Sequence, residues 1–189
     1  RGGEDRAAGA VALPRGKRMG PAELGLVASL GIAEVSVERR LRVAFFSTGD
    51  ELASIGRPLA PGEVYDSNRY TLHGALTRLG CDLLDMGVIP DRREALEAAF
   101  REAASASDVV LTTGGVSVGT HDVVQTSALA DVLSFVRVTM QPGKPQGFGT
   151  LGERNVPVIT LPGNPVSALV SFEVFVAPAL RVMAGRPAS

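Results

Sequence analysis

From residue 41 onward, short apolar runs alternate with segments in which apolar residues recur at helical spacing. The apolar runs are continuous, which is typical of strands buried on both faces of a parallel sheet. They predict strands at residues 42–46, 82–88, 108–112 and 156–160. The remaining segments predict helices at residues 68–79, 91–104, 122–129 and 165–183. This alternation indicates an α/β fold: a three-layer α/β/α sandwich with a mostly parallel sheet.

Two of these helices carry signals at their N-termini. Asp91 and Glu94 have the spacing of a capping box, which predicts that Asp91 caps the helix at 91–104. Pro165 stands in the first turn of the helix at 165–183, where proline is tolerated, and Pro178 is a candidate kink. This last helix is very apolar, but it carries charged side chains and is short of the roughly 20 apolar residues that span a bilayer. We therefore interpret it as a buried helix.

Residues 1–40 are organised differently. Their pattern predicts a short strand at 11–13, a helix from Pro21 to about Leu30 and a second strand at 33–37. The segment has too few apolar residues to form a core, so we expect it to pack on something else. The chain thus divides into a segment at 1–40 and an α/β domain from residue 41 onward.

Composition narrows the class of protein. The chain has 45% hydrophobic residues and a formal net charge of −1, which supports a packed core and argues against a nucleic-acid partner. A single cysteine, Cys81, excludes an intramolecular disulfide framework and is interpreted as a small buried hydrophobe. No signal peptide opens the chain, so a cytoplasmic protein without a membrane partner is expected. Both ends are interpreted as cut, which predicts a fragment of a longer protein.

Ligands of open α/β sheets bind outside the carboxyl ends of the strands. The segments that follow the predicted strands are rich in Gly, Pro, hydroxyl and carboxylate groups, at residues 47–51, 89–91, 113–122 and 161–167. Their convergence on one edge of the sheet predicts a ligand site there.

The glycine-rich loop at 114–119 allows a ligand to approach the backbone, whose amides could hold phosphate or oxyanion groups. The alternative is an ordinary strand-to-helix turn. The loop matches neither a Walker A sequence nor the dinucleotide fingerprint.

Four carboxylates are predicted on the same edge: Asp50, Glu51, Asp91 and Asp122. Carboxylates beside a phosphate-binding loop commonly form a Mg²⁺ site. Spacing alone leaves open whether Asp122 is a ligand or the cap of the next helix, and Asp91 by itself is better explained as a cap. No zinc site is expected, because His and Cys do not cluster.

Lys144 lies in a turn rich in Pro and Gly at 141–145. A rigid turn that holds one Lys suggests a tethered anion site; the alternative is a solvated Lys. Arg137 lies on the preceding strand and faces either the same pocket or solvent.

Together, these motifs resemble the molybdopterin molybdenumtransferases, the MoeA family that includes the gephyrin E domain. The motifs that carry the resemblance occur in the family's order at 47–52, 65–69, 114–119 with Asp122, 142–145 and 161–167, and the likeness reaches back through 3–5 and 28–35. It implies that residues 41–186 form the family's molybdopterin-binding, MogA-like domain and that residues 1–40 are part of the elongated domain that precedes it. It also implies a Mg²⁺-dependent reaction of adenylylated molybdopterin with molybdate, which yields molybdenum cofactor and AMP. A homodimer is implied, as is contact with other proteins of molybdenum cofactor biosynthesis.

The resemblance also implies the site residues. Catalytic positions are Asp5, Glu51, Asp91, Asp122, Arg137 and Lys144, of which Glu51, Asp91 and Asp122 are the implied metal ligands. Cofactor-binding positions are Thr48, Gly49, Gly114, Gly115, Ser117, Gly119, Pro142, Gly143, Pro162, Gly163, Asn164, Pro165 and Ser167. Arg137 and Lys144 would offset the charge of molybdate and phosphates.

Two positions depart from the family pattern, and two other functions stay open. Gln141 stands where a Lys is common, which removes one cation from the anion site, and His121 stands near a position that is often acidic. The alternatives are a MogA-like molybdopterin adenylyltransferase and a non-catalytic scaffold of the same fold. Whether the chain turns over without the family's other domains is also open.

Overall fold

The computed structural model describes residue 7, residues 9–114 and residues 133–188 of the chain. The chain divides into two compact units, Arg1–Arg39 and Arg40–Ser189. Each unit is described by itself.

The described part of the first unit contains one helix, α1 (Pro21–Ser29). The carboxylate of Glu23 accepts the backbone N–H of Gly20 at 3.0 Å, which closes the start of the helix. Backbone hydrogen bonds, including this one, and the hydrogen bond from Lys17 lower the pKa of Glu23. The predicted helix is confirmed, but the strands predicted at 11–13 and 33–37 are wrong, because neither segment is a strand. A strand needs a neighbouring strand for its backbone hydrogen bonds, and alternation of apolar residues does not supply one.

The second unit is built on a six-stranded sheet in the order β4-β1-β5-β8-β7-β6. Its parallel strands are β4 (Asp82–Ile89), β1 (Arg42–Thr48), β5 (Val109–Thr113) and β8 (Val156–Leu161). All four were predicted from the apolar runs. The sheet continues with β7 (Pro145–Leu151) antiparallel to β8, and with β6 (Leu133–Arg137) antiparallel to β7. The pattern does not predict β7, because this strand begins with Pro and has Gly at two of its seven positions.

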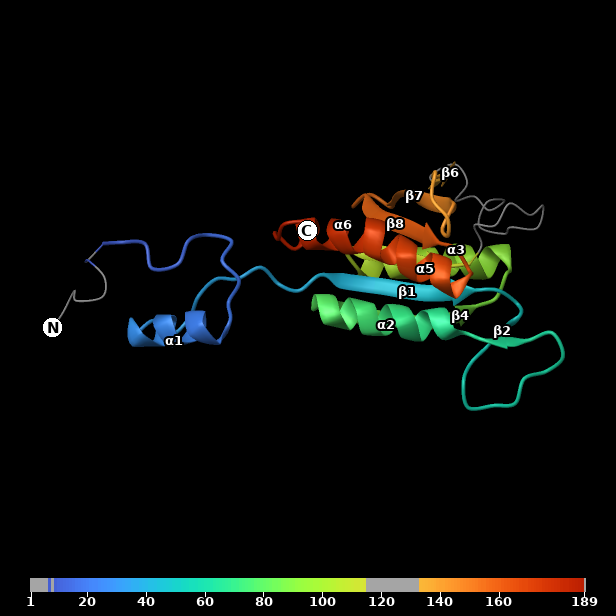
Figure 1. Cartoon of the computed structure of the whole chain (residues 1–189), viewed down its shortest axis with the longest axis horizontal. Coiled ribbons are helices and arrows are strands. Elements are labelled where there is room, and N and C mark those ends of the chain that lie inside the picture. The colour runs from blue at the N-terminus through green and yellow to red at the C-terminus, as the bar shows by residue number, and fades with distance from the viewer. Residues whose placement is uncertain (1–6, 8, 115–132, 189) are drawn as a thin grey trace. The chain divides into compact units, whose positions relative to one another are not determined.

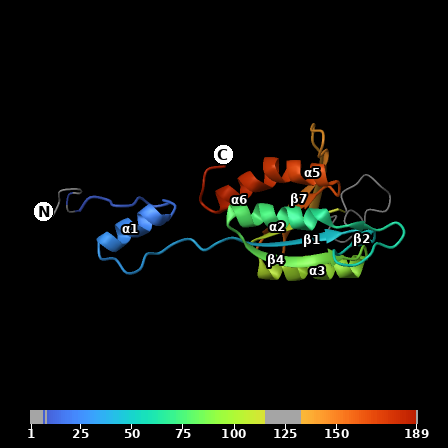
Figure 2. The same cartoon turned by 60° about the horizontal axis from the view of Figure 1, so that its bottom comes forward.

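Helices cover both faces of the sheet, as Figures 1 and 2 show. On one face lie α2 (Ser67–Leu79) and the long C-terminal helix, which consists of α5 (Pro165–Ser171), a π-helical segment (Phe172–Val176) and α6 (Ala177–Met183). On the other face lies α3 (Arg93–Ala106). The predicted three-layer α/β sandwich is confirmed. The helix predicted at 122–129 lies outside the described residues.

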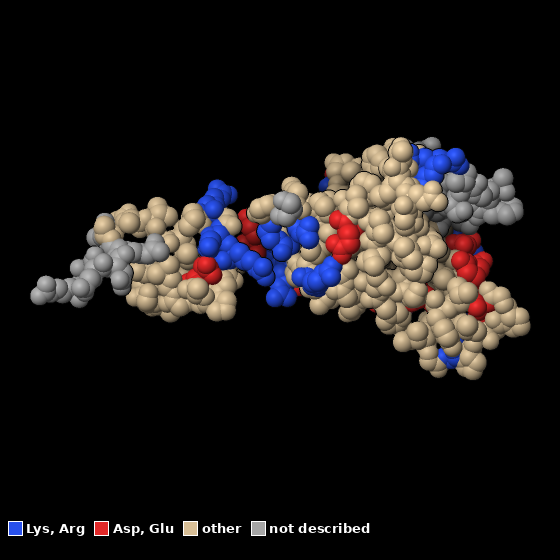
Figure 3. All heavy atoms as spheres, viewed as in Figure 1, with Lys and Arg blue, Asp and Glu red and all other residues tan. Residues whose placement is uncertain are grey.

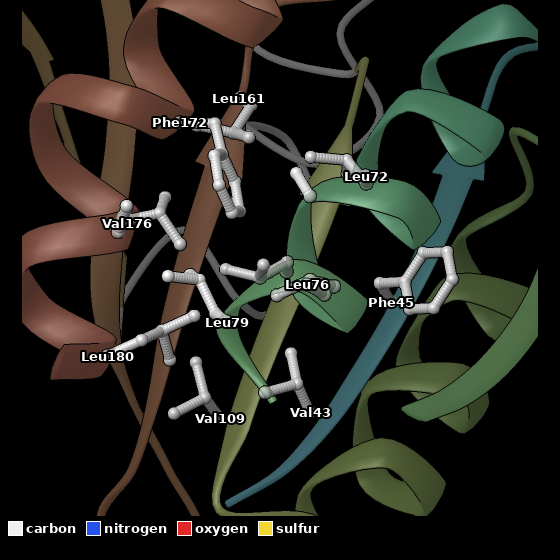
Figure 4. Packing of buried hydrophobic residues seen from close by; sticks show 13 residues of the cluster. Val43, Phe45, Leu72, Leu76, Leu79, Val109, Leu161, Phe172, Val176 and Leu180 are labelled. Atoms are coloured by element: carbon white, nitrogen blue, oxygen red, sulfur yellow. The ribbon is translucent and has the colours of Figure 1, made fainter. Parts of the chain in front are cut away.

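Two hydrophobic clusters fill the space between the layers. Figure 4 shows the first, in which Phe45 of β1, Leu76 of α2 and Phe172 of the C-terminal helix pack together and are fully buried. Cys81 packs against this cluster but is only partly buried, less than predicted, and desolvation raises the pKa of its thiol. The second cluster joins the opposite face of the sheet to α3, where the rings of Phe46 and Phe100 meet edge to face at 5.0 Å. Burial of each such ring contributes about 2 kcal/mol.

The C-terminal helix is long and apolar enough to cross a membrane by length and composition alone. Its inner face nevertheless belongs to the core, since Phe172, Val176 and Leu180 are buried. The helix is therefore a packed core helix, as predicted. Its π-helical segment ends just before Pro178, whose ring and missing N–H disturb regular α-helical hydrogen bonding.

The predicted capping box of α3 is wrong. The helix begins at Arg93, and its N-cap residue, Arg92, makes no side-chain capping hydrogen bond. The carboxylate of Asp91 instead accepts a hydrogen bond from the hydroxyl of Thr48 at the end of β1. A donor from a distant strand has therefore replaced the local backbone amides that a capping box would use.

Candidate anion and cofactor site at the carboxyl edge of the sheet

The sheet topology gathers the predicted site residues at one edge. The carboxyl ends of β1, β4, β5 and β8 share this edge because the strands are parallel. The end of β6 lies there too, because two antiparallel pairings restore its direction. Arg137 ends β6 opposite Pro145, and the N–H of Val138 donates to the carbonyl of Lys144 at 2.8 Å. The end of β6, which carries Arg137, and the turn that carries Lys144 therefore lie at the same edge as the ends of the parallel strands.

The turns after β1 and β4 are tied together. Besides the bond from Thr48, the N–H of Asp91 donates to the carboxylate of Asp50 at 3.1 Å. Two links therefore join the loops, and they fix the backbone of Asp91 as well as its carboxylate. Thr48 is buried, whereas Asp50 is exposed.

The backbone of Glu51 is held by a small two-stranded sheet. This sheet pairs β2 (Leu52–Ala53) with β3 (Val64–Tyr65), and the N–H of Val64 donates to the carbonyl of Glu51 at 2.8 Å. The carboxylate of Glu51 lies over Gly49, where a Cβ would come within 2.7 Å of it. Gly49 therefore leaves the room that the Glu51 carboxylate occupies.

The loop between β2 and β3 is closed by an ion pair. The guanidinium of Arg57 contacts both oxygens of Glu63, at 2.7 and 2.6 Å, and the hydroxyl of Tyr65 donates to the carbonyl of Arg57 at 2.7 Å. The hydrogen bond from Arg57 is the largest of the causes that lower the pKa of Glu63 to about 2. The loop extends from the carboxyl edge beside β2 in Figure 1.

Gly114 brings three strand ends into contact. Its φ is +87°, and a Cβ on it would lie 2.3 Å from the carbonyl oxygen of Thr48. Its N–H donates to the carbonyl of Leu161 at 3.1 Å. Only glycine fits this position, because the φ is left-handed and the backbone of β1 fills the space of a side chain.

The loop after β8 is fixed by two asparagines. Asn164 caps α5: its side-chain oxygen accepts the N–H of Ser167 at 3.1 Å and the hydroxyl of Ser167 at 3.2 Å. The side-chain amide of Asn68, at the start of α2, donates to the carbonyl of Gly163 at 2.7 Å. Gly163 is in turn close to Gly114, since its Cβ would meet the Cα of Gly114 at 3.7 Å. The loops after β5 and β8 and the start of α2 therefore form one contact region.

The turn between β6 and β7 packs against α5. Gly143 has a φ of +100°, and its Cβ would lie 2.7 Å from both the Cε of Met140 and the hydroxyl oxygen of Ser171. The side-chain amide of Gln146 donates to the carbonyl of Gly143 at 2.7 Å and to the hydroxyl oxygen of Ser171 at 2.6 Å. Lys144 itself is exposed.

Both acidic and basic side chains lie at this edge. Figure 3 shows acidic side chains on the surface near β2 and basic side chains near the end of the β6–β7 hairpin. The described acidic residues of the first region include Asp50, Glu51 and Asp91, and the hairpin turn carries Arg137 and Lys144. The edge therefore offers both oxygen ligands and cations.

Several predicted site residues lie outside the described part of the chain: Asp5, Gly115, Ser117, Gly119 and Asp122, as does His121, one of the two departures from the family pattern. Among the described residues, no group of three or more His, Cys, Asp or Glu side chains could hold a metal ion. The predicted ligand set of Glu51, Asp91 and Asp122 includes one of the residues outside that part, so it stays a prediction.

Two positions at this edge were not assigned a role from the sequence. Asp66 caps α2 by accepting the N–H of Arg69 at 3.1 Å, and Asn68 holds the loop after β8. Both residues are buried, at 2% and 8% exposed, and neither Oδ2 of Asp66 nor Oδ1 of Asn68 has a hydrogen-bond partner among the described residues. The spacing of an N-cap was available in the sequence for Asp66. No local signal marks Asn68, because its partner lies 95 residues away.

The fold defines a class of protein, a layered α/β domain with a mostly parallel sheet, and the ligands of such domains bind at the carboxyl ends of the strands. The exposed cations Arg137 and Lys144 at this edge suit a ligand that carries phosphate or another oxyanion.

Similarity to known proteins identifies the family. Residues 44–182 match the family profile MoCF_biosynth, described as a probable molybdopterin binding domain, and the chain belongs to this family. It is 45% identical over 186 residues to the molybdopterin molybdenumtransferase of Haemophilus influenzae, a match that covers 97% of this chain and 45% of the relative. It is also 45% identical over 194 residues to molybdopterin molybdenumtransferase 2 of Mycobacterium tuberculosis, covering 99% of this chain and 47% of the relative.

The solved structure of a molybdopterin biosynthesis MoeA protein from Pyrococcus horikoshii superimposes with a TM-score of 0.77. The two share 35% sequence identity, and the match covers 90% of this chain and 42% of that one. The resemblance inferred from the motifs is confirmed. The chain spans about half the length of the curated relatives that it matches.

Proposed function

We propose that this protein inserts molybdenum into the pterin cofactor: adenylylated molybdopterin and molybdate react to give molybdenum cofactor and AMP. The observation that carries the proposal is the 45% identity to a molybdopterin molybdenumtransferase over 97% of the chain. That similarity extends beyond the domain matched at 44–182 into the first unit. An adenylyltransferase made of the α/β domain alone has no counterpart to that unit, so the extent of the match favours the transferase.

The acidic side of the edge fits a magnesium ion. Carboxylate oxygens are the ligands that Mg²⁺ prefers, and Glu51, Asp91 and Asp122 would hold it. Asp91 is suited to this because Thr48 and Asp50 fix its orientation. A bound Mg²⁺ would neutralise negative charge on the phosphates and molybdate.

The hairpin side of the edge serves the anionic substrates. Arg137 and Lys144 offset the charge of molybdate and of the phosphates. Gln141 leaves this pocket with one cation fewer than a Lys at that position would give. The cluster formed by Gly163, Asn164 and Ser167 gives the pterin a rigid wall, because Asn68 and the α5 cap hold it.

The protein is further proposed to be a cytoplasmic homodimer in which the partner subunit completes the cleft. We also propose contact with other proteins of molybdenum cofactor biosynthesis, as the family resemblance implies.

The test is molybdate-dependent release of AMP from adenylylated molybdopterin by the full-length protein, compared with Asp122→Asn. Release should require both molybdate and Mg²⁺ and should fall at least about a hundredfold in the variant, as for loss of a group that acts on the transition state. Asp82→Asn is the matched control, because Asp82 is an exposed carboxylate at the start of β4, at the opposite edge of the sheet. Asp82→Asn should retain full activity.

Two results would support the other functions. Rapid consumption of ATP with molybdopterin would identify an adenylyltransferase. Absence of both activities in the full-length protein, with the fold intact, would support a scaffold.

A further inference from the structure

The turn that carries Lys144 is fixed by a side-chain amide that plays no part in the proposed reaction. Gln146 is 6% exposed, on β7, and Ser171 is fully buried, on α5. The Nε2 of Gln146 donates to the hydroxyl oxygen of Ser171 at 2.6 Å and to the carbonyl of Gly143 at 2.7 Å. One amide thus connects the sheet, the helix and the turn.

The backbone on both sides of Lys144 is held by hydrogen bonds. The carbonyl of Gly143 accepts from Gln146, and the carbonyl of Lys144 accepts from the N–H of Val138 at 2.8 Å. Gly143 lies so close to α5 that a Cβ would come within 2.7 Å of the Ser171 hydroxyl oxygen. The backbone position from which the Lys144 side chain extends is therefore fixed, although the side chain itself is exposed.

We propose that Gln146 and Ser171 are positioning residues, which hold the turn so that Lys144 meets an oxyanion substrate at the carboxyl edge. This inference rests on the proposed function. A Lys ammonium is a point charge at the end of a flexible four-carbon side chain. Its attraction for an anion therefore depends on the position of the Lys backbone. Neither Gln146 nor Ser171 contacts the substrate in this scheme; both act through Gly143 and Lys144.

The orientation of the Gln146 amide supports a structural task of this kind. Its Nε2 makes both hydrogen bonds, whereas its Oε1 is buried and has no hydrogen-bond partner within the part of the chain that the structure describes. A buried acceptor without a partner is unfavourable. The amide N–H groups, which bond the turn and the helix, therefore explain why a Gln side chain occupies this buried position.

The variant Gln146→Met tests the inference, because Met fills similar space and donates no hydrogen bond. Ser171→Ala removes the other end of the connection and serves if Gln146→Met fails to fold. Ser134→Ala is the matched control: Ser134 is exposed on β6 of the same hairpin, at the other end of the strand from the turn.

The first measurement is amide hydrogen exchange of the full-length protein without ligands. Loss of the bond to Gly143 should speed exchange at the N–H of Val138 by about threefold to tenfold, which corresponds to one net hydrogen bond. The Ser134→Ala control should leave it unchanged. Unchanged exchange in both Gln146→Met and Ser171→Ala would overturn the inference.

The second measurement is the equilibrium affinity for molybdate by calorimetry. Gln146→Met should weaken it about threefold to tenfold. In a Lys144→Ala background, the same substitution should have no further effect, because its effect passes through Lys144. A full effect that persists in that background would show that Gln146 acts on the fold rather than on Lys144.

The two proposals fail in different ways. Wild-type protein that binds molybdate but releases no AMP contradicts the proposed function and leaves the role of Gln146 supported by the double-variant result. Wild-type protein that releases AMP, with Gln146→Met equal to it in both measurements, contradicts the positioning role alone.

Discussion

Replacement of Gly114 by Ala should destabilise the α/β unit far more than a Gly-to-Ala change usually does. The residue has a φ of +87°, and its Cβ would lie 2.3 Å from the carbonyl oxygen of Thr48. The left-handed backbone costs an alanine about 1–2 kcal/mol. The overlap adds about 1–3 kcal/mol, because the opposing atom belongs to a buried strand backbone, which moves less easily than a side chain.

Gly152 separates these two costs. It lies in the turn between β7 and β8 with a φ of +67°, and nothing lies within 4 Å of its Cβ position. Gly152→Ala should therefore lose only the backbone contribution of about 1–2 kcal/mol. The difference between the two variants isolates the contact between Gly114 and β1.

The assay is thermal and urea unfolding of the full-length protein and both variants. For a domain of this size, 1 kcal/mol corresponds to about 2–4 °C in Tm. The two contributions of Gly114→Ala add up to about 2–5 kcal/mol, so this variant should lower Tm by about 4–20 °C, and Gly152→Ala should lower it by about 2–8 °C. Equal losses in the two variants would refute the argument, since they would mean that the strand end yields to the added methyl group.

Two further predictions concern the loops of the carboxyl edge. Thr48→Val removes the hydroxyl that donates to Asp91 and should lower molybdate-dependent AMP release about tenfold, as expected for a hydrogen bond to a charged group. Thr48→Ser keeps the hydroxyl and should retain most of the activity. Equal activity in both variants would contradict this role of Thr48. Glu63 should titrate near pH 2, because Arg57 stabilises its ionised form. The ion pair therefore stabilises the loop fully above the ordinary carboxyl pKa of 4.5, and this contribution is lost as the pH falls through about 2. Carbon NMR should show the midpoint rising toward 4.5 in Arg57→Gln, and an unchanged midpoint would exclude Arg57 as the cause.

Local pattern predicted most of the α/β unit because its strands and helices bury residues at regular intervals. The continuous apolar run that forms β1 is an example: six of its seven residues are buried. The same reasoning failed in the first unit, where alternation at 33–37 predicted a strand that the structure lacks. Alternation of apolar and polar residues indicates only that a segment could form a strand. A strand also requires a neighbouring strand to accept and donate its backbone hydrogen bonds.

The candidate site was predicted as a set of loops but not as a set of contacts. The sequence placed Thr48, Gly114 and Gly163 after strands, and the structure places all three at one edge. It also marked Asp91 as a helix cap, whereas the carboxylate accepts its hydrogen bond from Thr48. A capping box and a carboxylate bound by a distant hydroxyl look identical in the sequence, because the competing donor lies 43 residues away.

The sequence by itself therefore determined the class of fold, the family and the loops that carry the chemistry, since periodicity and short motifs depend on neighbouring residues. Only the tertiary structure decided which loops touch. It placed β7 between β8 and β6, which returns the turn with Lys144 to the edge where the parallel strands end. It also joined Gln146 to Ser171 and Asn68 to Gly163. These contacts depend on the order of strands and the packing of helices, which no local spacing specifies.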